Sequence, residues 1–197
     1  MEKKIFRNRH HDTPGHAHEI TYSVYRRKNL FSNPDAAEMF LHELAAARKE
    51  FSFQLWAYVI MPNHVHLLIW PLEHVYRIDV INKAIKGRMA KKFIKFTKES
   101  GTIDLLKDYR ISEEVNGQYR VWQTGGGFDR NLWNSMAIHQ SIEYIEANPV
   151  RRKLAASPEH YRWSSAYARV NKESVIPDSF HLPVVLLNPQ YQRIGVV

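Results

Sequence analysis

Short runs of alternating or strongly apolar residues along the chain predict β-strands. Residues 18–26 alternate between apolar and polar side chains, which is the pattern of a half-buried strand. Residues 53–60 and 64–70 are rich in aromatic and β-branched side chains and flank a short turn that contains a proline. These two segments therefore predict a β-hairpin.

Apolar residues spaced three and four apart predict three helices. The first covers residues 34–49, where Asn33 supplies the N-cap and a proline occupies the first helical position. A long helix is expected from about residue 75 to 98, because its apolar residues form a single stripe. A third helix is expected over residues 134–148, ended by the proline that follows.

The remaining segments complete an α+β order of elements. Residues 100–117 show no period and predict a loop with short irregular pieces, and residues 118–123 predict a fourth strand that glycines 125–127 end. The order of strands and helices suggests one antiparallel sheet with the helices packed on one face. We expect a basic arm over residues 1–15, one main domain over 16–169 and a C-terminal extension over 170–197.

Composition and charge limit the classes of partner and of metal site that the chain is expected to have. The chain has 28 Lys and Arg against 20 Asp and Glu, a net charge of +8, which favours nucleic acid as a partner over a membrane. With no cysteine, disulfides, thiolate metal sites and a thiol nucleophile are all excluded, so any metal must take nitrogen or oxygen ligands. No apolar run is long enough for a membrane helix, and we expect a cytoplasmic protein.

The long helix carries a run of basic residues without an intervening acid between Lys83 and Lys98. Such a run is either a solvated helix face or a surface that contacts phosphates, and the sequence leaves both interpretations open. The candidate DNA-binding residues are Lys83, Lys86, Arg88, Lys91, Lys92 and Lys95.

His64 and His66 are the first candidates for chemistry. They lie two positions apart in a predicted strand, so their side chains leave the same face of the sheet, where two imidazoles are able to chelate one divalent ion. Two hydrogen-bonded histidines without a metal are the commoner outcome for such a pair. A further ligand elsewhere in the chain would favour the metal site.

The third helix offers such a ligand. At about 100° per residue, its isoleucine stripe leaves Tyr144 off the core-facing side, with Asn148 one turn after it and Gln140 one turn before it. We therefore interpret His64, His66 and Asn148 as ligands of a divalent ion and Tyr144 as a nucleophile that attacks a phosphodiester. A phosphotyrosine link conserves the bond energy, so that a free DNA hydroxyl is able to rejoin the strand.

Three ordered motifs carry a resemblance to a known family. The segments 58–71 (YVIMPNHVHLLIWP), 144–150 (YIEANPV) and 161–165 (YRWSS), with Trp122-Gln123 and Phe128-Asp129-Arg130 between the first two, resemble the REP-associated tyrosine transposases. These are kin of the small insertion-sequence transposases of the His-hydrophobic-His superfamily. The similarity extends from about residue 16 to 169.

The resemblance implies a fold, a cofactor and a substrate. It implies a ferredoxin-like or RRM-like sheet with the histidines on a central strand and the tyrosine on a helix, together with Mg²⁺ or Mn²⁺. It also implies cleavage and rejoining of single-stranded DNA beside a hairpin, through Tyr144 and a 5'-phosphotyrosine. His64 and His66 match the metal-binding histidines, and Asn148 matches a polar residue that is often Gln in the relatives.

The remaining histidines and the glycine run are not assigned to the site. The cluster His10, His11, His16 and His18 is interpreted as surface histidines rather than a second metal site, and His139 is given no role. Glycines 125–127 are expected to let the tyrosine helix move.

Two other functions remain as alternatives. The first is a domesticated protein that binds a nucleic-acid hairpin without cutting it. For either function the sequence leaves open whether the protein acts as a monomer or a homodimer. The second is a different metal enzyme or a histidine phosphotransferase, of which the histidine-triad hydrolases are excluded because their His-x-His-x-His pattern has leucine at position 68 here.

Overall fold

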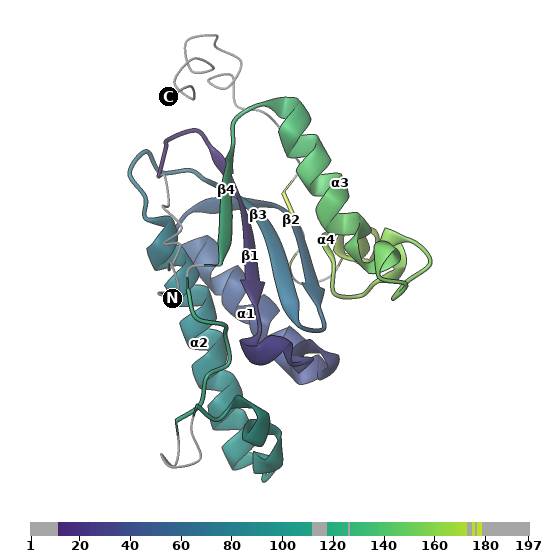
Figure 1. Ribbon diagram of the computed structural model, residues 1–197. Coiled ribbons are helices and arrows are strands. Elements are labelled where there is room, and N and C mark those ends of the chain that lie inside the picture. Colours follow the sequence, from purple (N-terminus) through teal and green to yellow (C-terminus); the bar gives the residue numbers. More distant parts are fainter. Residues whose placement is uncertain (1–11, 112–117, 126, 173–174, 176, 179–197) are drawn as a thin grey trace, which may run out of the picture.

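The protein is described by a computed structural model that covers residues 12–111, 118–125, 127–172, 175 and 177–178. Its centre is one antiparallel sheet of four strands in the order β2-β3-β1-β4 (Figure 1). The strands are β1 (Ala17–Ser23), β2 (Phe53–Met61), β3 (His64–Pro71) and β4 (Phe128–Leu132). The predicted α+β class, the first strand and the hairpin are confirmed.

Helices lie between β1 and β2, between β3 and β4, and after β4. They are α1 (Pro34–Glu50), α2 (Ile78–Glu99), α3 (Ser135–Arg151) and α4 (Ser165–Asn171), with short 3-10 helices η1 (Tyr25–Arg27), η2 (Leu30–Ser32), η3 (Ile103–Tyr109) and η4 (Pro158–His160). At the start of α1 the Asn33 side chain accepts a hydrogen bond of 2.8 Å from the Asp35 backbone N–H, as the cap sequence predicts.

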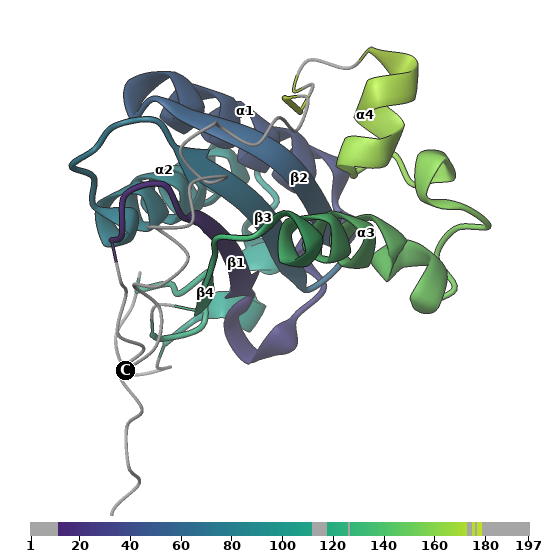
Figure 2. The same ribbon diagram turned by 90° about the horizontal axis from the view of Figure 1, so that it is seen from above.

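The helices cover both faces of the sheet rather than one. Helices α1 and α2 lie on the face that carries Ile20 and Val65, whereas α3 packs on the other face against Trp56 and Leu68 (Figure 2). The physical reason lies in β2, whose residues are buried on both faces, so that a single layer of helices would leave half of its apolar side chains in water. The expected placement of all helices on one face was wrong.

The fourth strand is not residues 118–123. That segment forms only isolated bridges, Val24 with Trp122 and Arg110 with Tyr119, and it buries Val121 and Trp122 in the core beside α2. Its aromatic side chains serve the core rather than a sheet face. The actual edge strand, β4, is short and polar and gives little strand signal of its own.

Helix α3 does not end before Pro149 but continues to Arg151. A proline in the last turn removes only one backbone donor, and here its ring is buried. The Arg152 N–H donates to the carbonyl of Asn148 and closes the helix.

His18 is not a surface histidine, contrary to the expectation for the histidine cluster. It is fully buried, with Nδ1 2.9 Å from Asp129 Oδ1 and Nε2 2.8 Å from the Tyr76 hydroxyl. The side chain points to the α2 face of the sheet, where both partners lie. His16 is half-buried and stacks on Trp133.

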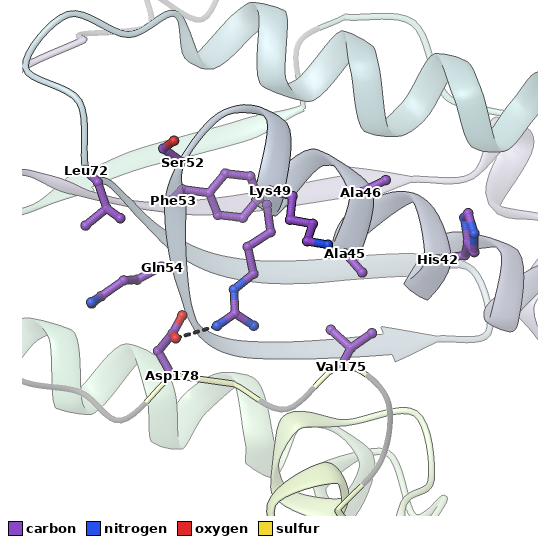
Figure 3. Close-up of a pocket in the computed structure, with 11 residues that line it drawn as sticks. His42, Ala45, Ala46, Lys49, Ser52, Phe53, Gln54, Leu72, Val175 and Asp178 are labelled. Atoms are coloured by element: carbon purple, nitrogen blue, oxygen red, sulfur yellow. Dashed lines mark hydrogen bonds and ion pairs between the residues drawn. The ribbon is translucent and has the colours of Figure 1, made fainter.

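Two residues of the predicted C-terminal extension contact the main domain. Val175 is buried in the core, and Asp178 pairs with Arg48 and accepts a hydrogen bond of 2.7 Å from the Leu55 backbone N–H. With α1 and the start of β2 they line a cavity of about 670 Å³ (Figure 3). His10, His11 and most of the predicted basic arm and extension lie outside the described residues.

Candidate functional site

The two histidines of β3 lie side by side on the face of the sheet that α3 covers. Val65 between them points into the opposite core, as strand geometry requires. The His64 and His66 rings have centroids 4.9 Å apart and lie nearly perpendicular to each other. His66 is buried, with 7% of its surface exposed, and His64 is half-buried.

Each histidine has a partner at Nδ1. His64 Nδ1 lies 2.6 Å from the Asn63 Oδ1, and because an amide oxygen only accepts, this nitrogen donates and Nε2 is left with its lone pair. His66 Nδ1 lies 2.9 Å from the Thr21 hydroxyl on the neighbouring strand β1. In both rings Nδ1 contacts a neighbouring side chain, so each ring is oriented and Nε2 is the nitrogen available to a ligand.

The environment keeps both imidazoles neutral. Burial lowers the pKa of His66 to about 3, and the neighbouring His64 contributes in the same direction. Burial also lowers the pKa of His64 to about 4, with further contributions from the positive charges of Arg152 and Arg27. Neutral imidazole is the form that binds metal ions, so the pair is in the ligating state at neutral pH.

Tyr144 faces the histidines from α3. Ile138 and Ile145 of this helix are fully buried, whereas Tyr144 is 41% exposed, so the prediction that it lies off the core face is confirmed. Its ring meets His66 edge-on, with centroids 5.8 Å apart, and the Arg151 guanidinium lies 4.9 Å from the ring centroid on α3. The fold thus brings His64, His66 and Tyr144 together from distant parts of the chain.

Asn148 is buried on α3, one turn after Tyr144. Its Nδ2 donates a hydrogen bond of 2.9 Å to the Tyr144 backbone carbonyl. Among the described residues, Asn148 makes no hydrogen bond to either histidine, and its Oδ1 accepts none. The amide oxygen is therefore the atom that this side chain has left for a ligand.

A cavity of about 550 Å³ opens between β1, β3, β4 and α3 beside Tyr144 and His66. Its other lining residues are Glu19, Thr21, Phe128, Arg130, Gln140 and Ser141. Glu19 is buried and accepts hydrogen bonds from Arg130 Nη2 at 2.6 Å and from Ser141 Oγ at 2.9 Å.

Sequence reasoning gave no role to Glu19 and Thr21. The signal was present, because both alternate with the apolar residues of β1 and so had to lie on the histidine face of the sheet. Polar residues on the second face of a strand are normally assigned to solvent. Only the packing of α3 on that face shows that they are enclosed.

The basic residues of α2 lie on the other side of the sheet from the histidines. Several are paired with acids, and the pairs are Lys83 with Asp79, Arg88 with Glu50, Lys92 with Glu43 and Lys95 with Glu99. Lys86 is half-buried and its ammonium lies over the Tyr22 ring, and Lys91 is exposed. The acids at positions 43 and 50 come from α1, which explains why the basic run alone gave no sign of them.

The described part of the chain contains neither a cluster of acidic, His or Cys metal ligands nor a membrane-spanning helix. No cluster of three or more His, Cys, Asp or Glu side chains able to hold a metal occurs in the residues that the structure covers. Within the same residues, no helix has the length and apolarity needed to cross a membrane.

Strands β1, β2 and β3, the histidine pair and the basic helix α2 lie in the part of the chain that matches a known protein family. The family model "Transposase IS200 like" matches residues 13–125, more than half of the chain, and the protein belongs to this family. The match ends before α3, so Tyr144 and Asn148 lie beyond it.

One solved structure has the same fold as this chain. A REP-associated tyrosine transposase bound to a REP hairpin matches with a TM-score of 0.62 and 17% identity, over 93% of this chain and 94% of that chain. A Deinococcus radiodurans R1 protein assigned as a transposase has 20% identity over 74% of this chain and 96% of that chain, with a TM-score of only 0.43. No curated protein matches the chain.

Proposed function

We propose that the protein is a metal-dependent transposase that cleaves and rejoins single-stranded DNA beside a hairpin, with Tyr144 as the nucleophile. Membership of the IS200-like transposase family supports the class of reaction. The observation that carries the assignment of residues is the edge-on contact of the Tyr144 and His66 rings, with centroids 5.8 Å apart across the interface of α3 and the sheet.

His64 and His66 fit a divalent ion. Both rings are neutral near pH 7 because burial lowers each pKa, and in each the Nδ1 atom already has a partner. Asn148 through Oδ1 is the proposed third ligand, and Gln140, which lines the cavity, is the alternative amide. A bound Mg²⁺ or Mn²⁺ would polarise a non-bridging phosphate oxygen as a Lewis acid. Because imidazole is a softer ligand than water or carboxylate, we expect Mn²⁺ to bind more tightly than Mg²⁺.

Tyr144 would attack phosphorus through its hydroxyl oxygen. The new bond joins the tyrosine oxygen to phosphorus and the bond to the 3'-oxygen of the preceding nucleotide breaks, which leaves a 5'-phosphotyrosine and a free 3'-hydroxyl. The phenol proton is lost to solvent or to a base, and the leaving oxygen takes up a proton. In the reverse direction, a DNA 3'-hydroxyl attacks the phosphotyrosine and restores a phosphodiester without ATP.

Arg130 is placed to contact the phosphate in this reaction. Its guanidinium lines the cavity with Tyr144 and His66, and the buried Glu19 carboxylate holds it at 2.6 Å. Ser141 of α3 donates to the same carboxylate, so the strand and the tyrosine helix are joined through Glu19. A guanidinium fixed in this way loses less freedom on binding a phosphate than a free one.

The proposed DNA partner is a hairpin with a single-stranded flank. The support is the fold match to a transposase that was solved bound to a REP hairpin, together with the net charge of +8. We retain the α2 residues Lys83, Lys86, Arg88, Lys91, Lys92 and Lys95 as the proposed contacts to the hairpin backbone. They lie on the face of the sheet opposite the histidines, so the hairpin would extend around the sheet edge from the cleavage site.

A denaturing gel tests the proposal. The protein is incubated with single-stranded DNA that contains hairpins with unpaired flanks, in Mn²⁺, in Mg²⁺ or in EDTA. We expect a protein-DNA adduct that survives denaturant and forms only with a divalent ion. Binding of these DNAs without any adduct would instead support a non-cleaving hairpin-binding protein.

A further inference from the structure

A second polar cavity adjoins the histidine pair at the turn end of the hairpin. It has a volume of about 440 Å³, and His64 lines it, whereas His66 lines the cavity of Tyr144. Arg27 of η1 and Arg152 at the end of α3 both line it, with Asn29 and Asn63 as further polar lining residues. The two cavities therefore lie at either member of one histidine pair, whose rings are 4.9 Å apart.

The two arginines of this cavity lack acidic partners. Neither Arg27 nor Arg152 forms an ion pair with any residue that the structure describes, and both are exposed. The basic residues of α2 differ in this respect, because Arg88 and Lys92 are neutralised by α1 acids. Two arginines without acidic partners that line one cavity favour a polyanion as its ligand.

The backbone N–H groups of both arginines are hydrogen-bonded, and Arg27 lies in a strained segment. Arg26 and Arg27 have φ values of 51° and 53°, a left-handed conformation that costs about 1 kcal/mol or more per non-glycine residue. The Arg27 N–H donates to the Val24 carbonyl at 3.0 Å, and the Arg152 N–H donates to the Asn148 carbonyl at 3.0 Å. The second bond ties Arg152 to Asn148, one helix turn after Tyr144. Backbone strain of this kind is concentrated at ligand-binding segments.

We propose that Arg27 and Arg152 bind a backbone phosphate of the single-stranded DNA next to the scissile phosphate. The inference rests on the proposed function for the identity of the polyanion. A strand that presents one phosphate to His64, His66 and Tyr144 must carry its neighbouring phosphate past one side of the pair, and the Arg27 and Arg152 cavity is the positively charged opening on the His64 side. Guanidinium groups bind phosphate oxygens through two parallel hydrogen bonds, which fixes the register of the strand.

The test is a phosphate-neutralisation scan. The full-length Tyr144→Phe protein, which cannot form the adduct, is titrated with a hairpin DNA whose single-stranded flank carries one uncharged methylphosphonate, moved position by position. The scan is repeated with Arg27→Gln and Arg152→Gln added to the same protein. A control protein carries Arg26→Gln and Lys153→Gln, which remove the same charge one residue away in each segment.

We expect one position beside the scissile phosphate at which methylphosphonate weakens binding about tenfold in the parent and in the control, and has no further effect in the Arg27→Gln, Arg152→Gln protein. The slope of log affinity against log salt should also fall by about 0.7 in that protein, as for loss of one single-strand phosphate contact. A penalty that survives the two substitutions, its loss in the control as well, or no such position in the parent would overturn the inference.

The outcome of this scan is independent of the cleavage reaction. If wild-type protein forms no adduct but one flank position shows a penalty that disappears with the two arginines, Arg27 and Arg152 bind a phosphate of the single strand and the enzymatic proposal fails. If the adduct forms but the scan is unchanged by the substitutions, the enzymatic proposal stands and the phosphate site is wrong.

Discussion

Thr21 links strand β1 to the chemistry on β3 through one hydrogen bond to His66 Nδ1. Replacement by valine keeps the shape but removes the hydroxyl, so the His66 ring loses its orienting partner. We expect Thr21→Val to weaken Mn²⁺ binding about 10- to 100-fold, as measured by calorimetry on metal-free protein. Thr21→Ser, which keeps the hydroxyl, should restore most of the affinity, and equal affinities in all three proteins would contradict this role.

The buried histidines also make the stability of the metal-free protein depend on pH. In the folded protein, burial lowers the pKa of His66 to about 3 and of His64 to about 4, against 6.5 for an ordinary histidine. Below about pH 6.5 the unfolded chain therefore takes up protons that the folded chain does not, and the free energy of unfolding falls as the pH drops toward 4.

Urea denaturation in EDTA at several pH values between about 7 and about 5 measures this effect. The loss of unfolding free energy over this interval should be smaller in a protein with His64→Gln and His66→Gln, because the glutamines do not titrate. The same loss in both proteins would show that the histidines are not buried as neutral groups.

At the residue scale, the sequence predicted those positions whose local period decides their placement. The spacing of His64 and His66 in a strand fixes a common face, and the isoleucine stripe of α3 fixes Tyr144 outside the core. The enclosure of Glu19 and His18 depends on Arg130 and Asp129, which come from β4 far along the chain. No local pattern contains that information.

At the scale of elements, the junction into β4 is the most constrained point. A Cβ at Gly127 would lie 2.3 Å from the Thr21 carbonyl oxygen, and the φ of Gly127 is +79°. Gly125 also has a positive φ, of +102°, but a Cβ there would meet no atom within 4 Å. A side chain at Gly125 would therefore add backbone strain alone, whereas a side chain at Gly127 would add both backbone strain and a steric overlap.

We expect Gly127→Ala to destabilise the protein by more than Gly125→Ala, for which backbone strain alone costs about 1–2 kcal/mol. In Gly127→Ala, β4 must also move away from β1 at Thr21, so metal affinity should fall as well. Urea denaturation and Mn²⁺ titration of the two variants test this, and equal effects would contradict it. The expectation that glycines 125–127 let α3 move stays a prediction, with residue 126 outside the described part.

Elements with strong caps and periods were predicted well, and weak ones were not. The cap at Asn33 placed the start of α1 correctly, and the apolar stripe of α2 placed that helix to within three residues at each end. Strand β4 is a polar edge strand whose existence depends on pairing with β1, and the strand signal of residues 118–123 came from side chains that fill the core instead.

At the scale of the whole molecule, basic side chains lie in two separate regions, one on α2 and one beside the histidines. The α2 face carries the longest basic run, but α1 acids neutralise part of it, whereas Arg27 and Arg152 beside the histidines are unpaired among the described residues. This arrangement was hidden from the sequence, because helix packing decides which acids reach which bases.

Lys91 tests the part played by α2, since it is exposed on this helix. If α2 contacts the hairpin stem, Lys91→Gln should lower the slope of log affinity against log salt by about 0.9, the value for one duplex phosphate contact. Lys49→Gln on α1 removes the same charge away from the proposed DNA surface and should leave the slope unchanged. An unchanged slope in Lys91→Gln would remove this residue from the DNA-binding surface.

The covalent attachment of DNA to Tyr144 is the most direct test of the account. The adduct formed with Mn²⁺ is digested with protease and nuclease, and the peptide that carries the residual nucleotide is identified by mass spectrometry. We predict a phosphotyrosine at Tyr144, and no adduct with Tyr144→Phe, which still binds the same DNA with similar affinity. An adduct at another residue, or one that persists in Tyr144→Phe, would contradict the proposed site.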